Sequence, residues 1–147
     1  MFVRLLPIMT LPKLQSQIHV LYVDIEPQKL TLFRNSFSSV FKVSLCSDAT
    51  EASEIINSSK VDVLISNDCL PNDSGVQLLE NVMQYHPEVG RILITNSKDV
   101  ESVIDAVQRS KVFRFLTKPW KKSELIKTIR ASFEFSQRKI FARSAYC

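Results

Sequence analysis

Apolar positions along the chain fall into two spacings, which alternate from one end to the other. Short apolar runs rich in branched residues predict buried β-strands. They lie at Ile18–Val23, Phe41–Cys46, Val61–Asn67, Arg91–Thr95 and Val112–Leu116. Between and after these runs, apolar residues recur every three or four positions, which places them on one face of a helix. The pattern therefore predicts strands and helices in strict alternation.

Each predicted helix carries an apolar face, and some carry a start signal. Pro27 fits the first turn of a helix, where its missing N–H costs nothing. Asp48 or Thr50 can cap the next helix, and the last helix is expected to begin near Ser123. The inward faces are expected at Leu30, Phe33, Phe37 and Val40; at Ala52, Ile55 and Ile56; at Leu78, Leu79, Val82 and Met83; at Val100, Val103, Ile104 and Val107; and at Leu125, Ile126, Ile129 and Phe133.

This alternation restricts the fold class. Neighbouring parallel strands need a long crossover, and crossover helices cover both faces of the sheet. Right-handed crossovers then give a doubly wound arrangement. We therefore expect an α/β fold of the flavodoxin-like type, with a five-stranded parallel sheet in the order 2-1-3-4-5.

The length of 147 residues fits one domain, which we place at residues 18–137. Residues 1–17 are expected to form a flexible N-terminal extension. A secretory signal peptide is disfavoured there, because Pro7 and Pro12 interrupt the apolar stretch and no small-residue cleavage site follows. Met1 and Met9 both stay open as the start. Residues 138–147 are expected to form a basic C-terminal tail, or else to extend the last helix.

Composition adds little to this picture. Apolar residues make up 45% and charged residues 23%, and the net charge of +4 is too small to indicate nucleic-acid binding. The three cysteines and two histidines are too widely spaced for a zinc site or a disulfide framework. A reducing, cytoplasmic location is therefore the expectation, and no apolar run is long enough to span a membrane.

Polar side chains end several of the predicted strands. Asp24, Asn67, Thr95 and Lys118 follow or close the first, third, fourth and fifth strands. Each alone has an ordinary explanation as a cap or a solvated strand end. In an open α/β sheet, however, the carboxyl ends of the strands meet at one edge, where ligands bind. The four positions together favour a shared pocket.

The same residues stand in motifs that resemble the response-regulator receiver domains of two-component signalling. The matching stretches are Val20-Leu21-Tyr22-Val23-Asp24, Asp62-Val63-Leu64-Ile65-Ser66-Asn67, Leu70-Pro71 with Gly75, Ile94-Thr95, and Phe113-Arg114-Phe115-Leu116-Thr117-Lys118-Pro119-Trp120. The last is the most specific, and it is similar to receivers that precede cyclic-di-GMP phosphodiesterase or other effector domains. The resemblance covers about residues 18–137.

The resemblance implies a role for each matching residue. In the family, an acidic pair after the first strand binds Mg²⁺, and an Asp ending the third strand accepts a phosphoryl group from a histidine kinase. By resemblance, Thr95 would touch the phosphoryl oxygens, Lys118 would neutralise their charge, and Phe115 would be the aromatic that changes rotamer with the state. Lys118–Pro119 would be joined by a cis peptide bond, which only X-Pro adopts at low cost.

Three positions depart from the family pattern. The second acid of the pair is Ile25, the phosphoacceptor position is Asn67, and Asn96 stands where Gly or Ala is usual. An amide is a poor nucleophile, so no acyl phosphate can form at Asn67 by the family route. We therefore expect a vestigial pocket with no catalytic residue.

The same departures weaken a metal site. The family pocket sets three carboxylates against one lysine, whereas this pocket sets Asp24 against Lys118, which changes the formal charge from about −2 to about 0. Mg²⁺ prefers octahedral oxygen ligands with carboxylate charge. We expect no metal site and no cofactor, apart from weak Mg²⁺ binding. Asp24 and Lys118 are expected to interact directly or through Asn67.

Neighbouring carboxylates leave an alternative open. Glu26 and Asp68 each come one residue late, and in a strand that offset turns a side chain to the opposite face. The backbone bends at a strand end, so Asp68 stays open as an alternative phosphoacceptor. Deamidation of Asn67 would also restore an acceptor, although not the ligand lost at Ile25.

Two function classes follow from these observations. The first is an atypical receiver in phosphorelay signal transduction, which acts as a binding module rather than an enzyme. The alternative is a phosphorylatable receiver that uses a shifted acceptor such as Asp68 with Mg²⁺. A flavin-binding flavodoxin is disfavoured, because Asp24–Pro27 is not a Ser/Thr/Gly-rich phosphate loop and the chain has only 2 glycines.

Output is expected through protein contacts at the face built by the fourth helix, the fifth strand and the fifth helix. That face carries Phe113, Arg114, Phe115, Trp120, Lys121 and Lys122 in or beside it. Trp and Arg are enriched at interaction hot spots. The expected partner is a histidine kinase, an effector or another regulator, with no membrane contact. The late basic residues Arg138, Lys139 and Arg143 are a thin basis for nucleic-acid binding.

Overall fold

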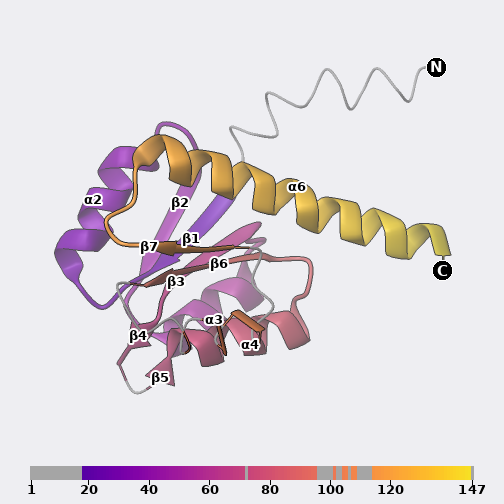
Figure 1. Ribbon diagram of the computed structural model, residues 1–147, viewed down its shortest axis with the longest axis horizontal. Helices are drawn as coiled ribbons and strands as arrows, with labels where there is room; N and C mark the ends of the chain where they lie inside the picture. Colours follow the sequence, from indigo (N-terminus) through magenta and orange to yellow (C-terminus); the bar gives the residue numbers. More distant parts are fainter. Residues whose placement is uncertain are drawn as a thin grey trace.

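The computed structural model describes residues 18–71, 73–95, 101, 104–105, 107–108 and 114–146 (Figure 1). The expected extension at residues 1–17 lies outside this range, as do Asn96, Val100, Val103 and Phe113. Among the described residues, no helix has the length and apolar character that crossing a bilayer requires.

The expected sheet is confirmed. Its strands are β1 (His19–Val23), β2 (Lys42–Cys46), β3 (Val63–Asn67), β6 (Gly90–Thr95) and β7 (Arg114–Thr117), all paired in parallel. Their order is β2-β1-β3-β6-β7, which is the order 2-1-3-4-5 of the predicted strands. All five carboxyl ends therefore open at one edge of the sheet, from which β7 passes into the last helix (Figure 1).

Helices cover both faces of the sheet. Helices α2 (Pro27–Phe37) and α6 (Lys122–Tyr146) lie on one face, and α3 (Ala49–Ser58) and α4 (Gly75–Tyr85) lie on the other (Figure 1). Of the helix expected around residues 100–107, the structure describes five residues, at 101, 104, 105, 107 and 108, and all have helical backbone.

The core consists of two apolar layers, because successive strand residues point to opposite faces. Leu21, Val23 and Leu64 pack against α3 and α4, whereas Val20, Tyr22 and Ile65 pack against α2 and α6. Tyr22 stacks on Phe33 with ring centroids 4.3 Å apart, and Trp120 packs on Phe33 and Phe37. This aromatic group lies directly beneath the carboxyl-end edge and fixes the residues that follow β1 and β7.

One inward position was predicted wrongly. Ile104 was expected to face the core, yet its side chain is 49% exposed. Val107, which was also expected to face the core, does pack against the α3/α4 layer. Exposed apolar residues are common on folded proteins, so an apolar residue in a helical pattern need not be buried.

Local signals explain where α3 and α4 begin. Asp48 caps α3, with its side chain accepting a hydrogen bond from the Glu51 amide at 2.7 Å, which settles the choice between Asp48 and Thr50. Ser74 caps α4 in the same way, at 3.0 Å from the Gln77 amide. Ser74 was not predicted as a cap, although Ser74 and Gln77 have the Ser-x-x-Gln spacing of a capping box. The residues before Gly75 were expected to form a simple polar loop.

That stretch is instead a small antiparallel hairpin of β4 (Cys69–Leu70) and β5 (Asp73–Ser74). Each strand is only 2 residues long, too short to show an alternating pattern. The hairpin turns the chain between the end of β3 and the start of α4.

The last helix continues to Tyr146, which is the helical alternative for the C-terminal residues. Its 25 residues give a length of about 37 Å, and its C-terminal part projects beyond the sheet (Figure 1).

Candidate functional site

The carboxyl-end edge brings all four expected pocket residues together. Asp24 follows β1, Asn67 ends β3, Thr95 ends β6 and Lys118 follows β7. Asp24 is fully buried, and Asn67 and Thr95 are nearly so. The strand order makes β1, β3, β6 and β7 consecutive neighbours, so these residues form one continuous row.

Asp24 is the centre of this row because its carboxylate accepts four hydrogen bonds from the chain. One oxygen, Oδ2, accepts from the Tyr22 hydroxyl at 2.6 Å and from Lys118 Nζ at 3.4 Å. The other, Oδ1, accepts from the Glu26 amide at 3.0 Å and from Asn67 Nδ2 at 3.4 Å. A carboxylate offers about four acceptor positions, so the protein fills all of them.

The ion pair expected between Asp24 and Lys118 is therefore present. Asp24 has no exposed surface and the Lys118 side chain is 15% exposed, so the pair is shielded from solvent. The contact between Asn67 and Asp24 adds the bridge through Asn67 that was the other expectation. Pairs of this kind set local geometry more than they add net stability.

Tyr22 belongs to the site although the sequence did not single it out. It lies two residues before Asp24, on the same side of the strand, and donates the shortest of the four hydrogen bonds. Burial, followed by the hydrogen bond to Asp24, raises the pKa of the Tyr22 hydroxyl well above its usual value. Tyr22 therefore stays protonated and remains a donor. Strand alternation could have predicted this contact from the sequence, since residues i and i+2 of a strand share a face.

Asn67 uses both ends of its amide. Its Oδ1 accepts from the Asp68 amide at 3.0 Å, while its Nδ2 donates to Asp24 and, at 3.4 Å, to the Cys69 carbonyl. The Asp68 amide fixes which end is oxygen, because only an oxygen can accept that N–H. Asn67 thus behaves as a fixed donor toward Asp24.

Asp68 reaches the same edge. Strand β3 ends at Asn67, so strand alternation no longer decides where the Asp68 side chain points. Its Oδ2 accepts a hydrogen bond from the Thr95 hydroxyl at 2.5 Å. The row of strand ends therefore holds two carboxylates, Asp24 and Asp68, and one lysine, whereas the charge count made from the sequence included only Asp24 and Lys118.

Backbone contacts close the row into a ring. The Lys118 amide donates to the Thr95 carbonyl at 2.9 Å, and the Asp68 amide donates to the Ile94 carbonyl at 3.1 Å. The peptide bond between Lys118 and Pro119 is cis, as expected. The ring runs from Asp24 through Lys118, Thr95, Asp68 and Asn67 and back to Asp24.

Gly75 supports this ring from α4. A Cβ at this position would lie 1.8 Å from the Asn67 carbonyl oxygen, so only glycine lets α4 approach the end of β3 this closely. The Gly75 amide also donates to the Asp68 carbonyl at 2.9 Å. The start of α4 is therefore fixed against the residues that carry Asn67 and Asp68.

Two further expected residues lie at the surface. Ile25, which stands where the family has its second acid, is 47% exposed, and Phe115 on the edge strand β7 is 40% exposed. Within the described part of the chain, no three His, Cys, Asp or Glu side chains are arranged to hold a metal ion.

Comparison with known proteins identifies the family. The family model described as "Response regulator receiver domain" matches residues 20–130. The chain is 31% identical over 118 residues to the hydrogenase transcriptional regulatory protein HoxA of Cupriavidus necator, covering 80% of this chain and 24% of that protein. It is 30% identical over 119 residues to the transcriptional regulatory protein GlrR of Escherichia coli, covering 80% of this chain and 27% of GlrR.

Solved structures agree with this assignment. The signal receiver domain of an HD domain-containing protein from Pseudomonas fluorescens Pf-5 superposes with a TM-score of 0.79 at 29% identity, covering 84% of this chain and 92% of that one. The chain spans about a quarter of the length of its curated relatives but nearly the whole of this receiver domain. The chain belongs to the response regulator receiver domain family, the receiver modules of two-component phosphorelay signalling.

Proposed function

We propose that this chain is an atypical receiver that acts as a binding module, with no phosphorylation of an aspartate. The observation that carries the proposal is the set of contacts at the acceptor position. Asn67 stands there, and both ends of its amide are bound to neighbouring groups. An amide carries no negative charge and its nitrogen lone pair is delocalised into the carbonyl group, so it is a poor nucleophile toward phosphorus.

The same contacts argue against resident Mg²⁺, the metal that the family implies. Asp24 is the single acid retained from the family's metal ligands, and four protein donors occupy its carboxylate. A metal ion would have to displace Lys118 or Asn67, whose contacts at 3.4 Å are the longest of the four. The nearby ammonium of Lys118 would also repel the ion. The residues therefore do not fit a magnesium site.

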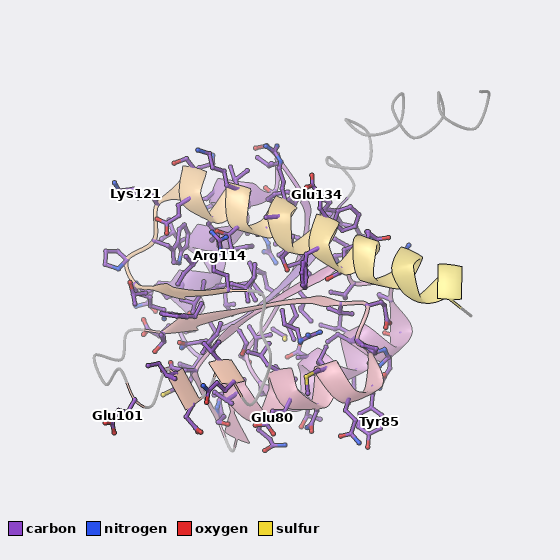
Figure 2. All side chains as sticks on the ribbon, turned by 45° about the vertical axis from the view of Figure 1, so that its right-hand side comes forward. Glu80, Tyr85, Glu101, Arg114, Lys121 and Glu134 are labelled. Carbon is purple, nitrogen blue, oxygen red and sulfur yellow. The ribbon has the colours of Figure 1, made fainter. Side chains whose placement is uncertain are left out.

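Partner binding is proposed at the surface formed by β7 and the start of α6. Phe115 is 40% exposed, and Arg114, Lys121 and Lys122 are exposed as well. Figure 2 labels Arg114 and Lys121 on this side of the molecule. Trp120 is half-buried and held by Phe33 and Phe37, so it is a rigid part of this surface. A partly exposed aromatic group with arginine beside it is typical of a binding hot spot.

The proposed partner is a histidine kinase, an effector or another regulator in the cytoplasm. Two of the relatives are named as transcriptional regulatory proteins, which makes a regulator of that kind a candidate. A basic surface of this type favours a partner with an acidic complementary patch.

One observation favours the alternative function, a receiver phosphorylated at Asp68. The Asp68 carboxylate lies at the correct edge of the sheet and contacts Thr95. It is, however, already engaged by that hydroxyl, and the described residues place no group of three His, Cys, Asp or Glu side chains around it that could hold Mg²⁺. We therefore rank this alternative second.

Acetyl phosphate labelling separates the two functions. Wild-type protein and the double variant Ile25→Asp/Asn67→Asp are incubated with acetyl phosphate and Mg²⁺, and their intact masses are measured. The proposal predicts that only the double variant gains a phosphoryl group. Labelling of the wild type, followed by mapping of the label to Asp68, would instead establish the alternative. The variant Asp68→Ala serves as the control for that site.

A further inference from the structure

The amide, the carbonyl and the side chain of Asp68 all form hydrogen bonds with other residues. Its amide donates to the Ile94 carbonyl at 3.1 Å and to Asn67 Oδ1 at 3.0 Å. Its carbonyl accepts from the Gly75 amide, and its side chain accepts from Thr95. One residue therefore connects the end of β3 to β6 and to the start of α4.

The contact with Thr95 has a chemical consequence. A threonine hydroxyl carries one proton, so it can donate one full hydrogen bond at a time. The separation of 2.5 Å between Thr95 Oγ1 and Asp68 Oδ2 is that of a strong bond to an ionised carboxylate. Only 1% of the surface of Thr95 is exposed, so water does not compete for the hydroxyl proton. The Thr95 proton is committed to an anion supplied by the chain itself.

We propose that Asp68 is a positioning residue that serves as the resident anion of this pocket. Its carboxylate holds Thr95 in the orientation in which the hydroxyl donates to an oxyanion, and it thereby keeps the hydroxyl from any oxyanion that arrives from solution. This inference deepens the proposed function, on which it rests. The pocket lacks an acceptor at Asn67, and the buried hydroxyl of Thr95 has a permanent internal ligand.

A resident anion and a purely structural residue at position 68 would have different effects on reactivity. A structural residue would stabilise the turn after β3 without changing reactivity through Thr95. A resident anion, in contrast, competes with phosphate for the Thr95 hydroxyl. The difference becomes measurable when a reactive acceptor is introduced beside it.

The test uses the full-length double variant Ile25→Asp/Asn67→Asp as its background. Label forms when an oxygen of the carboxylate introduced at position 67 bonds to phosphorus of acetyl phosphate and acetate leaves with the electron pair of the broken P–O bond. Labelling rates are compared with and without Asp68→Ala, and again with Thr95→Val added to both. Glu54→Ala, an exposed position on α3, controls for the loss of one negative charge.

We expect Asp68→Ala to raise the labelling rate by about tenfold when Thr95 is present and to have little effect when position 95 is valine, as a released charge-assisted hydrogen bond would give. An equal gain in both backgrounds would mean that Asp68 acts by charge repulsion alone, which would overturn the proposal. The absence of any gain would overturn it as well.

A second measurement does not depend on labelling. Three-bond NMR couplings to the Thr95 methyl carbon report the χ1 rotamer of Thr95 in the otherwise unmodified chain. We expect a single rotamer in the wild type and averaging between rotamers in Asp68→Ala. Identical couplings in the two proteins would contradict the role of Asp68. Labelling of the wild type at Asp68 would overturn the proposed function, and these couplings would still test the hydrogen bond separately.

Discussion

At the scale of single residues, the pocket depends on Asp24 having enough donors. A buried carboxylate without partners is very costly, and here two short and two longer hydrogen bonds offset that cost. The Tyr22 hydroxyl is the shortest of these donors and the only one contributed from within β1. Removal of the Tyr22 hydroxyl alone therefore tests how strongly the buried carboxylate of Asp24 depends on its donors.

Tyr22→Phe should lower the free energy of unfolding by about 1–3 kcal/mol, because it leaves one acceptor of a buried charge unpaired while the ring packing is kept. Urea unfolding measures the change. Tyr85→Phe is the matched control, since Tyr85 on α4 points away from the sheet and is 70% exposed (Figure 2). Equal effects of the two substitutions would show that the Tyr22 hydrogen bond adds nothing.

The two described cysteines should differ sharply in reactivity. Burial, followed by the charges of Glu51 and Asp48, raises the pKa of the Cys46 thiol to about 12. Near pH 8 that thiol is almost entirely protonated, and the thiolate is the reactive form. Iodoacetamide should therefore modify the exposed Cys69 and spare Cys46 in the native protein, as read by peptide mapping. Rapid native labelling of Cys46 would contradict its placement, and labelling in urea is the positive control.

At the scale of elements, the junction between β3 and α4 is the tightest contact at the site. Gly75→Ala would improve intrinsic helix propensity by about 1 kcal/mol. The new Cβ would nevertheless meet the Asn67 carbonyl oxygen at 1.8 Å, and a backbone atom cannot rotate away. We expect a net loss of about 2 kcal/mol or more in the free energy of unfolding, as is usual for overpacking.

Gly90 supplies the contrast for that prediction. A Cβ there would meet the Ser132 hydroxyl of α6 at 2.4 Å, and that atom belongs to a side chain. Ser132→Ala should therefore rescue much of the loss caused by Gly90→Ala, whereas no side-chain change near Asn67 should rescue Gly75→Ala. A Gly75→Ala protein as stable as the wild type would refute the close approach.

The elements also show what the sequence could and could not predict. Apolar runs and helical spacing were enough for the strands and the sheet order, because parallel strands joined by right-handed crossovers leave few topologies. The exposure of Ile104 was predicted wrongly, since it depends on tertiary packing. The hairpin of β4 and β5 was missed, since strands of 2 residues are too short to show an alternating pattern.

The candidate site divides in the same way. The positions of Asp24, Asn67, Thr95 and Lys118 at one edge follow from strand ends alone. The contact between Asp68 and Thr95 does not, because it depends on how the backbone turns after β3. Strand alternation could have placed Tyr22 on the same face as Asp24, but in the sequence Tyr22 is indistinguishable from an ordinary core residue.

At the scale of the whole molecule, the edge of the sheet is held together by its own side chains. The ring from Asp24 through Lys118, Thr95, Asp68 and Asn67 spans four adjacent strands. In this ring the chain itself supplies both the cation beside Asp24 and the anion beside Thr95. We propose that signalling by this domain depends on the surface around Phe115 rather than on chemistry at the carboxyl-end edge.

We propose that the chain itself satisfies Asp24, which leaves no place for Mg²⁺ beside that carboxylate. It is tested most directly by titrating wild-type protein and Ile25→Asp/Asn67→Asp with MgCl₂ while amide NMR shifts are followed at Glu26 and at position 67. NaCl at the same ionic strength controls for salt effects. We predict saturable shifts at millimolar Mg²⁺ in the double variant and none in the wild type. Saturable shifts at these amides in the wild type would contradict the account.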